Sequence, residues 1–454
     1  MNQNTVEKLQ NLAVSLQWVT VEDMKRYTLP QLVTMIANKM NELINEVSRF
    51  EDMVFENVKN QNEKIQYLLG EGLHLEVCEV FSGWMNDGTF DTLINHSVLK
   101  SVNERIDETN TQLSHLNDKT NSVTINALYP PHQLNPCYGD GVNDDSQNLQ
   151  SMIDFLDENG GGVIQIPRGV YIVGDINIKS GVSIQGMSNL STYMGVSHPV
   201  ILRAKSGCET IINGFNSNAS NISGIMFDGN NQSSCGIIRG SFFTIENCHF
   251  INCKWALGNG IALQTFIIQN NKFNSNQVAI WSVVDSRVIN NTINANGMGI
   301  KLGNGSNDNI ITSNKIEWNN TIGIEMYQCH NNSISNNIID RQGQQGIDIR
   351  GCGNCTLSSN VFRRNGASTG DNLNIKTHIR SEGNERIVIT GNVTIASNTQ
   401  DDGSGLVEPP YSIIDYSNVD MLIVGNQLKG CTFKSIETYN STNTINSSNI
   451  TMGG

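Results

Sequence analysis

The spacing of apolar residues changes sharply along the chain. In residues 29–70, and again in residues 96–126, apolar side chains recur every three or four positions. The first of these seams consists of Leu32, Ile36, Met40, Leu43, Val47, Phe50, Val54, Val58, Ile65 and Leu68. This spacing is typical of an α-helical coiled coil. Because a narrow seam cannot bury itself, we expect copies of the chain to associate through it, with an intramolecular helical hairpin as the alternative.

Residues 71–95 interrupt the helical spacing. Gly70 and Gly72 end the first helix, and the turn-like sequence Asn86-Asp-Gly88 separates short apolar runs. We therefore predict a small linker domain between the two coiled coils.

Beyond residue 126 the pattern becomes that of short strands. Pro130, Pro131 and Pro136 cannot continue a helix. An amphipathic helix is predicted at about residues 145–158, with Asp145 or Ser146 as its N-cap and glycines 160–162 at its end. Alternating strand-like segments follow at residues 163–166, 170–173 and 182–185.

Asparagines then recur at a regular interval, mostly 20 or 23 residues. They are Asn271, Asn291, Asn314, Asn337, Asn360, Asn392, Asn426 and Asn449. A repeat of this length indicates a solenoid, in which stacked asparagines hydrogen-bond from coil to coil. We predict a mainly β fold for residues 127–454, a parallel β-helix, with insertions where the interval lengthens, near residues 367–371 and 397–410.

Composition and charge limit the partners. Charged residues make up only 16% of the chain and its net charge is -14, which argues against nucleic acid. No run of about 18 apolar residues occurs and Met1–Gln10 is polar, so we predict neither membrane insertion nor a signal peptide. The cysteine spacing gives no zinc site or disulfide framework, and Cys329 and Cys352, one repeat apart, fit small core residues. We expect no metal and no cofactor.

Two segments resemble known families. The run GDGVNDDSQNLQSMIDFLDENGGGVIQIPRGVYIV, residues 139–173, is similar to the opening of pectate-lyase-like right-handed β-helix proteins, where a helix caps the first coil. A coiled coil followed by such a β-helix resembles the tail spikes and preneck appendages of short-tailed bacteriophages. The segment SGWMNDGTFDTLINHSVL, residues 82–99, is similar to linkers in appendages of phages that infect Gram-positive bacteria.

This resemblance implies several properties. It implies a right-handed coil, a homotrimer, assembly in the bacterial host cytoplasm and a place in the virion as a tail or neck appendage. Residues 1–28 would then attach to virion connector or tail proteins. It implies no catalytic residues, because these spikes place them differently.

Aligning the coils predicts two outward columns of side chains. Segments 279–282, 299–302, 323–326, 346–349 and 373–376 align at one strand position, and alternation then points every second residue outward. The first column contains Trp281, Lys301, Glu325, Asp348 and Asn374, with Tyr327, Arg350 and Lys376 beside it. The second column contains Asn294, Glu317, Asp340 and Arg363. Both flank the same turn, so we expect them to line opposite walls of one groove.

Glu325 and Asp348 are the first catalytic candidates. On adjacent rungs, about 4.8 Å apart, two like charges cost stability, and the pKa of one carboxyl should rise. Such a pair suits acid and base catalysis of glycosidic cleavage. The alternatives are an exposed charge ladder neutralised by Lys301 and Arg350, and ligand binding without catalysis.

Glu317 and Asp340 are the second catalytic candidates. Their alternative is a solvated pair balanced by Arg341 and Arg363. Glu317 with Asp348, spanning the turn, would suit the wider carboxyl spacing of an inverting hydrolase.

Nearby aromatic and basic residues favour a saccharide ligand. Trp281, Trp318 and Tyr327 would stack on sugar rings or pack at coil edges. Basic residues outnumber acidic ones between Arg341 and Arg386 although the chain is acidic, so anionic groups would be held locally. The residues predicted to hold them are Lys301, Arg350, Lys376 and Arg363.

We therefore expect a phage appendage that adsorbs to the host cell surface and degrades a cell-wall polysaccharide or teichoic acid. A receptor-binding fibre without activity and a virion assembly protein are the alternatives.

Overall fold

The computed structural model describes residues 124–187, 200–231, 235–366, 376–395 and 408–452. The chain divides into two compact units, Met1–Thr111 and Gln112–Gly454, and all described residues belong to the second. The predicted segment 1–28, the coiled coil 29–70, the linker 71–95 and all but the last residues of the coiled coil 96–126 lie outside the described residues. Most of both predicted insertions lies outside them too.

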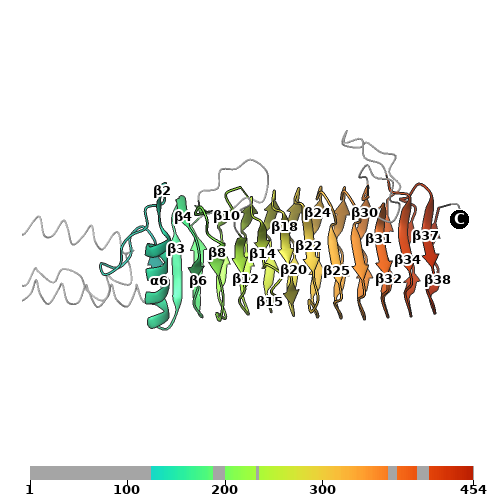
Figure 1. Ribbon diagram of the computed structural model, residues 1–454, viewed down its shortest axis with the longest axis horizontal. Helices are drawn as coiled ribbons and strands as arrows, with labels where there is room; N and C mark the ends of the chain where they lie inside the picture. Colours follow the sequence, from blue (N-terminus) through green and yellow to red (C-terminus); the bar gives the residue numbers. More distant parts are fainter. Residues whose placement is uncertain (1–123, 188–199, 232–234, 367–375, 396–407, 453–454) are drawn as a thin grey trace, which may run out of the picture. The chain divides into compact units, whose positions relative to one another are not determined.

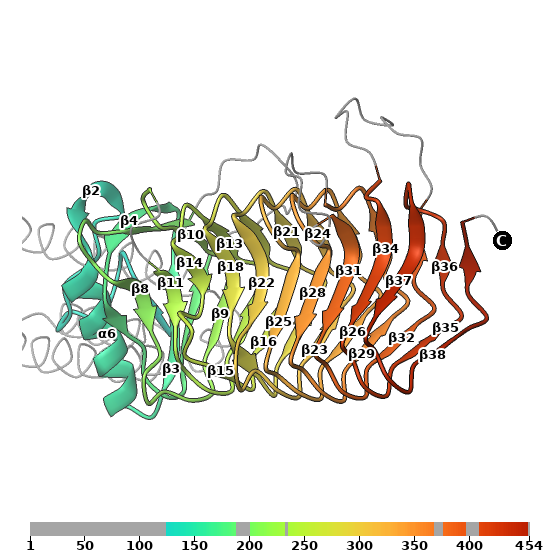
Figure 2. The same ribbon diagram turned by 45° about the vertical axis from the view of Figure 1, so that its right-hand side comes forward.

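The second unit is a stack of coils whose strands form three long parallel sheets (Figures 1 and 2). In the described residues, the first sheet contains, in spatial order, β1 (Thr124–Asn126), β3 (Gly162–Ile166), β6 (Val182–Gly186), β9 (Asn221–Ser223), β12 (Thr244–Glu246), β16 (Ile267–Gln269), β20 (Arg287–Ile289), β23 (Ile310–Thr312), β26 (Ser333–Ser335), β29 (Thr356–Ser358), β32 (Val388–Thr390), β35 (Leu422–Val424) and β38 (Ile445–Ser447).

The second and third sheets run beside the first. The second contains β2 (Asp140–Asp144), β4 (Gly169–Val173), β7 (Val200–Ala204), β10 (Met226–Asp228), β13 (His249–Ile251), β17 (Lys272–Asn274), β21 (Thr292–Asn294), β24 (Lys315–Glu317), β27 (Ile338–Asp340), β30 (Val361–Arg363), β33 (Val393–Thr394), β36 (Gln427–Leu428) and β39 (Ile450–Thr451). The third contains β5 (Ile176–Asn177), β8 (Thr210–Asn213), β11 (Cys235–Ile238), β14 (Trp255–Leu257), β18 (Val278–Trp281), β22 (Met298–Leu302), β25 (Ile324–Tyr327), β28 (Ile347–Arg350), β31 (Thr377–Glu382), β34 (Tyr411–Tyr416) and β37 (Lys434–Tyr439). A short additional pair consists of β15 (Leu263–Gln264) and β19 (Val283–Val284).

The predicted capping helix is confirmed. Helix α6 (Ser146–Glu158) follows Asp145 and buries Leu149, Met152, Ile153 and Leu156 at the N-terminal end of the stack (Figure 1). The side chain of Asp145 does not cap the helix. Its carboxylate instead accepts hydrogen bonds from the backbone N–H groups of Tyr138, at 2.5 Å, and Gly139, at 3.1 Å, and so fixes the preceding loop. No helix among the described residues is long and apolar enough to cross a membrane.

The interior is one apolar core flanked by polar ladders. Phe227, Phe250 and Phe273 stack on successive coils, with ring centroids 4.7 and 5.0 Å apart. The predicted asparagine ladder is confirmed, because Nδ2 of Asn337 donates to Oδ1 of Asn360 at 3.0 Å and the ladder continues in both directions. Cys329 and Cys352 are core residues, as predicted.

A second ladder, which the sequence alignment missed, turns the chain from the second sheet into the third. It contains Asn276, Asn296, Asn319, Gln342 and Asn365. A glutamine interrupts its asparagines, so identity at a fixed interval does not reveal it. The ladders on both sides of the second sheet fix the register of the outward columns.

Candidate functional site

The third sheet places most of the first predicted column in register. Trp281 pairs with Lys301, Lys301 with Glu325, and Glu325 with Asp348 on successive strands. Tyr327 pairs with Arg350 beside them. The sequence alignment therefore predicted the adjacency of the two carboxylates correctly.

The next rung differs from the prediction. Strand β31 supplies it, so Arg380 pairs with Asp348 and Glu382 pairs with Arg350. The predicted position of Lys376 was wrong, because this residue precedes the strand, and Asn374 lies outside the described residues. Segments 373–376 and 377–380 have similar polarity, so either could align with the strand of the preceding coil. The insertion before them breaks the regular repeat length that would show which segment belongs there.

The charge ladder is less exposed than predicted. Only 8% of the surface of Glu325 and 2% of that of Asp348 are exposed. Glu325 lies between two cations, with its Oε2 3.4 Å from Lys301 Nζ and its Oε1 2.6 Å from Arg350 Nη2. Oδ2 of Asp348 lies 3.2 Å from Arg350 Nε and 3.8 Å from Arg380 Nη1. The two arginine side chains therefore screen carboxylates that point out of the sheet.

Asp348 is the most perturbed acid of the column. Burial raises its pKa to about 6, with a smaller upward effect from Glu325 and Glu382 and an opposing effect from Arg350 and Arg380. Its Oδ1 is buried and accepts no hydrogen bond from the described residues. The predicted rise of one pKa agrees with the structure, but burial contributes more to it than Glu325 does.

The aromatic candidates lie against the same cations. Lys301 Nζ is 5.1 Å from the centroid of the Trp281 ring, which itself packs edge-on against Trp255 at 4.9 Å. The guanidinium of Arg350 is 5.7 Å from the centroid of Tyr327, a residue that is 45% exposed. Lys301 and Arg350 are thus already engaged by carboxylates and rings.

The second predicted column is also in register. Asn294, Glu317, Asp340 and Arg363 pair in this order on β21, β24, β27 and β30. Glu317 accepts a hydrogen bond from Asn294 Nδ2 at 3.0 Å and pairs with Lys315 at 3.2 Å. The groove predicted between the two columns stays a prediction.

The alternative of a solvated pair does not hold for Asp340. This residue is 3% exposed. Its Oδ2 is 2.9 Å from Arg364 Nη2, its Oδ1 is 3.3 Å from Arg364 Nε, and Arg341 pairs with it from the other side. The guanidinium of Arg341 also lies 4.7 Å from the centroid of Trp318, which is 40% exposed. Arg364 was not predicted from the sequence, because a charged residue one position past an outward strand residue gives no signal that it points inward.

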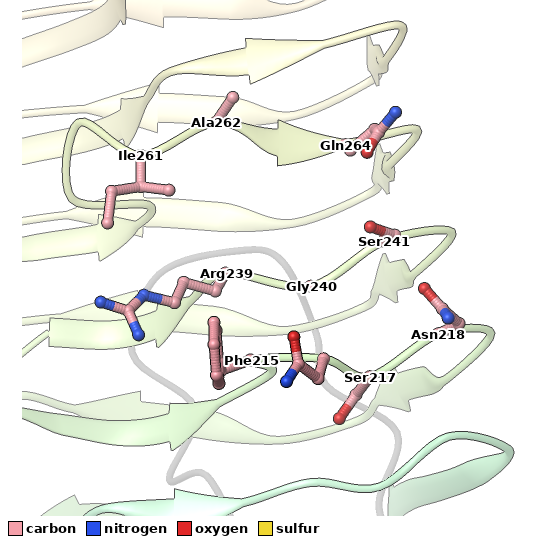
Figure 3. A pocket seen from close by; sticks show the side chains of 10 residues that line it. Phe215, Ser217, Asn218, Arg239, Gly240, Ser241, Ile261, Ala262 and Gln264 are labelled. Atoms are coloured by element: carbon pink, nitrogen blue, oxygen red, sulfur yellow. The ribbon is translucent and has the colours of Figure 1, made fainter.

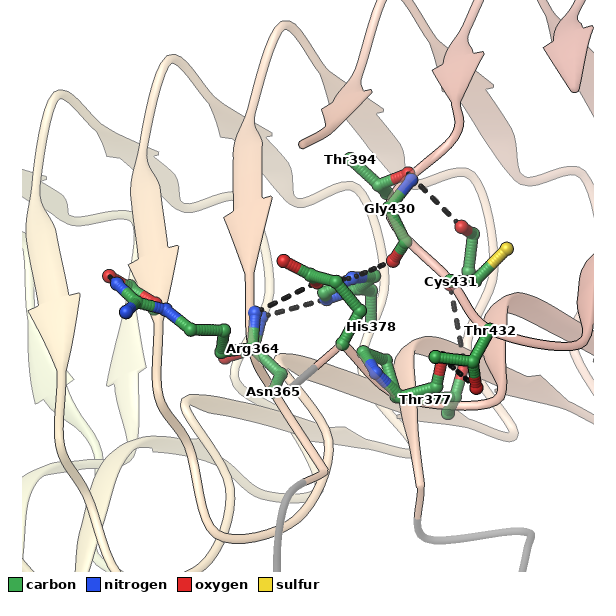
Figure 4. A network of polar contacts seen from close by, with 12 residues as sticks. Arg364, Asn365, Thr377, His378, Thr394, Gly430, Cys431 and Thr432 are labelled. Carbon is green, nitrogen blue, oxygen red and sulfur yellow. Dashed lines mark hydrogen bonds and ion pairs between the residues drawn. The ribbon is translucent and has the colours of Figure 1, made fainter. Parts of the chain in front are cut away.

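Arg364 belongs to a buried polar network (Figure 4). Its side chain is fully buried, and its backbone N–H donates to Oε2 of Glu408 at 3.0 Å. The same Glu408 oxygen lies 3.1 Å from Nε2 of His378, whose Nδ1 lies 3.0 Å from Nδ2 of Asn365. Asp340 is thus tied to the interior through Arg364.

No group of three His, Cys, Asp or Glu side chains within the described ranges is arranged to hold a metal ion. The third sheet presents carboxylates, cations and aromatic rings.

Comparison with protein families identifies the coil type. Residues 264–451 match the family described as the right handed beta helix region. At the sequence level, the chain is 28% identical over 193 residues to the SPbeta prophage-derived uncharacterized protein YomE of Bacillus subtilis strain 168. That alignment covers 39% of this chain and 29% of the relative, so the chain spans under a third of that protein's length.

Solved structures share the same fold. The enzymatically active domain of tailspike protein 2 from bacteriophage CBA120 superposes with a TM-score of 0.55 at 18% identity, covering 72% of this chain and 52% of that one. The A-module of the mannuronan C-5 epimerase AlgE6 from Azotobacter vinelandii gives a TM-score of 0.51 at 15% identity, covering 68% of this chain and 97% of that one. At these identities the likeness establishes a right-handed parallel β-helix and leaves the reaction open.

Proposed function

We propose that this chain is a phage tail spike or appendage that adsorbs to a bacterial surface and cleaves a cell-wall polysaccharide or teichoic acid. The prophage origin of the relative and the tailspike among the structural neighbours support the virion setting. The observation that carries the enzymatic proposal is the unequal pair on β25 and β28. Each carboxylate contacts two cations, but only Asp348 combines a raised pKa with a buried oxygen that accepts no hydrogen bond from the described residues.

This inequality supports different roles for the two carboxylates. Asp348, with a pKa of about 6, is the acid that protonates the leaving oxygen. Glu325, beside Lys301 and Arg350, is the nucleophile or the base that activates water. Adjacent rungs about 4.8 Å apart suit the short carboxyl separation of a retaining mechanism, about 5–5.5 Å.

The remaining predicted residues position the polymer. Arg350 and Arg380, with side chains 33% and 21% exposed, exchange their contacts with Asp348 for anionic groups of the polymer and so uncover the acid. Trp281 and Tyr327 carry sugar faces at the edge of the column. Arg363 is an outlying contact, and Glu317 and Asp340 are reserve candidates whose contacts favour a structural role.

The second candidate function is a receptor-binding fibre without activity, and the burial of Asp348 at 2% exposure favours it. A virion assembly protein is third. Purified full-length protein incubated with walls of Bacillus subtilis strain 168 separates the three. Release of soluble wall fragments supports the enzyme. Adsorption without fragments supports the fibre, and the absence of both fragments and adsorption supports the assembly protein.

We also propose that the active form is a homotrimer, joined through the apolar seams of residues 29–70 and 96–126 and attached to the virion through residues 1–28. Replacing Leu43 and Val47 together by Asp puts unpaired charges into a seam and should convert the trimer to smaller species. Light scattering on the full chain measures this. The control is Ser48→Asp, which lies off the seam, and a native mass that is not trimeric contradicts the proposal.

A further inference from the structure

A hollow lies on the turns that follow the third sheet (Figure 3), and its lining residues include neither Glu325 nor Asp348. Its volume is about 580 Å³, within the range of small-ligand sites. Three successive coils line it, mainly through Phe215, Asn218, Arg239, Ser241, Ile261 and Gln264.

Arg239 distinguishes this hollow from the charged column. Its guanidinium lies 5.1 Å from the centroid of the Phe215 ring, and Figure 3 shows the two side chains together at one side of the hollow. Among the described residues, this guanidinium has neither an ion pair nor a hydrogen bond. Arg350 and Arg380, in contrast, both contact Asp348. Arg239 is therefore a cation positioned at the hollow, and its donors have no partner among the residues that the structure describes.

The other side of the hollow is a row of neutral polar groups. Asn218 pairs with Ser241, and Ser241 pairs with Gln264, on adjacent coils. Amide and hydroxyl groups at this spacing, about 4.8 Å, can donate to and accept from neighbouring hydroxyls of a sugar. Phe215 and Ile261, 59% and 49% exposed, provide apolar surface for the C–H face of the ring.

We propose that this hollow is a subsite for an acidic saccharide, a sugar that carries a carboxylate or a phosphate. Arg239 binds the anionic group through paired N–H donors, and the row from Asn218 to Gln264 binds the hydroxyls. This proposal rests on the proposed glycan-binding function, and it adds that the polymer carries negative charge.

The subsite is positioned to hold a polymer that also reaches the carboxylates. Arg239 directly follows β11, and the order β11, β14, β18, β22, β25 and β28 separates it from Asp348 by five rungs, about 24 Å along the stack. An extended chain lying along the coils therefore spans both features, with the hollow as an anchor remote from the bond that is cleaved.

Trp281 offers an optical signal for binding. A Cβ built on Gly260 would lie 3.2 Å from Cζ2 of Trp281, so the indole packs directly under the turn that carries Ile261. A ligand that orders this turn should change the fluorescence of Trp281.

The test titrates the full-length protein with trigalacturonate, phosphorylated maltotriose and maltotriose, and binding is measured by calorimetry and tryptophan fluorescence. We expect one or both acidic probes to bind, and maltotriose to bind at least about tenfold more weakly. The probe that binds more tightly identifies the anion as carboxylate or phosphate. Arg239→Gln should weaken the acidic probe about tenfold, with Arg239→Lys intermediate because it keeps the charge but loses the paired donors.

The control variant is Arg287→Gln, which removes an exposed arginine from the outer face of β20 and should leave binding unchanged. The subsite is contradicted if the acidic probes bind equally well to the native protein and to Arg239→Gln. It is also contradicted if neither acidic probe binds to the native protein. Wall adsorption distinguishes this result from failure of the proposed function. A protein that binds acidic probes through Arg239 but does not adsorb to walls keeps the subsite and loses the function.

Discussion

The two carboxylate pairs differ although the same repeat places both on adjacent coils. Asp340, on the second sheet, has both oxygens bound by the fully buried Arg364 and a second arginine beside it. Asp348, on the third sheet, has two cations near one oxygen and no hydrogen bond on the other. Removing one partner of a fully paired buried charge leaves the other charge uncompensated, whereas an incompletely paired charge is already held in a costly state.

The partners differ in their freedom to move. Arg364 is 0% exposed and belongs to the network that contains Glu408 and His378. Arg350 and Arg380 are partly exposed, so an incoming anion can displace them. Perturbed carboxyls with movable partners are typical of reactive sites, and we expect catalysis at Asp348 and structure at Asp340.

The largest expected effect is on stability at Asp340. Asp340→Asn leaves Arg364 buried without its charged partner and should lower the free energy of unfolding by about 3–5 kcal/mol. Chemical denaturation of the full chain, monitored by circular dichroism of the β structure, measures this. Asp348→Asn is the matched comparison and should cost much less at pH 7; equal losses in the two variants would remove the distinction between the pairs.

A smaller loss is expected in the ladder that fixes both columns. Asn337→Leu removes hydrogen bonds to Asn360 and Ile311 and should cost about 1–3 kcal/mol. Thermal unfolding compares it with Ser333→Ala, an outward change on the same coil. An identical melting temperature for the two variants would mean that the ladder contributes little to stability.

An effect of similar size is the pH dependence of the stability that Asp348 contributes. Its pKa rises from 3.8 to about 6 on folding, so between these values the folded state binds more protons than the unfolded state. Native stability from this group therefore falls as the pH rises through this window, and the loss is complete above it.

Asp348→Asn cannot titrate, so its stability relative to the native protein should improve by about 1–3 kcal/mol from pH 4 to pH 7. Arg350, Arg380, Glu325 and Glu382 face this carboxyl and are present in both proteins. Unfolding at the two pH values measures the difference. A gap between variant and native protein that does not change with pH would show that the carboxyl has an ordinary pKa.

Much of the fold was predictable from the sequence, because a solenoid repeats its signals. The helix at residues 146–158, the ladder through Asn337 and the adjacency of Glu325 and Asp348 all follow from spacing and alternation. Spacing fails where an insertion breaks it, so Arg380 was missed and the rung beside Asp348 was assigned to segment 373–376.

Burial was harder to predict than register. Alternation along a strand predicts the face of the sheet from which a side chain projects, but it does not predict whether a neighbouring side chain covers it. The side chain of Asp348 projects from the outer face of the sheet and is screened by arginines. The side chain of Arg364 lies in the interior, one position after an outward residue. The hollow at Arg239 gave no motif, because its residues come from three turns that share no sequence pattern.

The most direct test of the central claim is the rate at which wall fragments are released by Glu325→Gln and Asp348→Asn. Both changes are nearly isosteric and remove acid and base function, so each should lower the rate by about 10²–10⁴-fold while adsorption to the walls persists. Glu437→Gln, a carboxylate farther along the same sheet, is the control and should retain the native rate. If Glu325→Gln and Asp348→Asn stay folded and release fragments at the native rate, these two residues are not the catalytic pair.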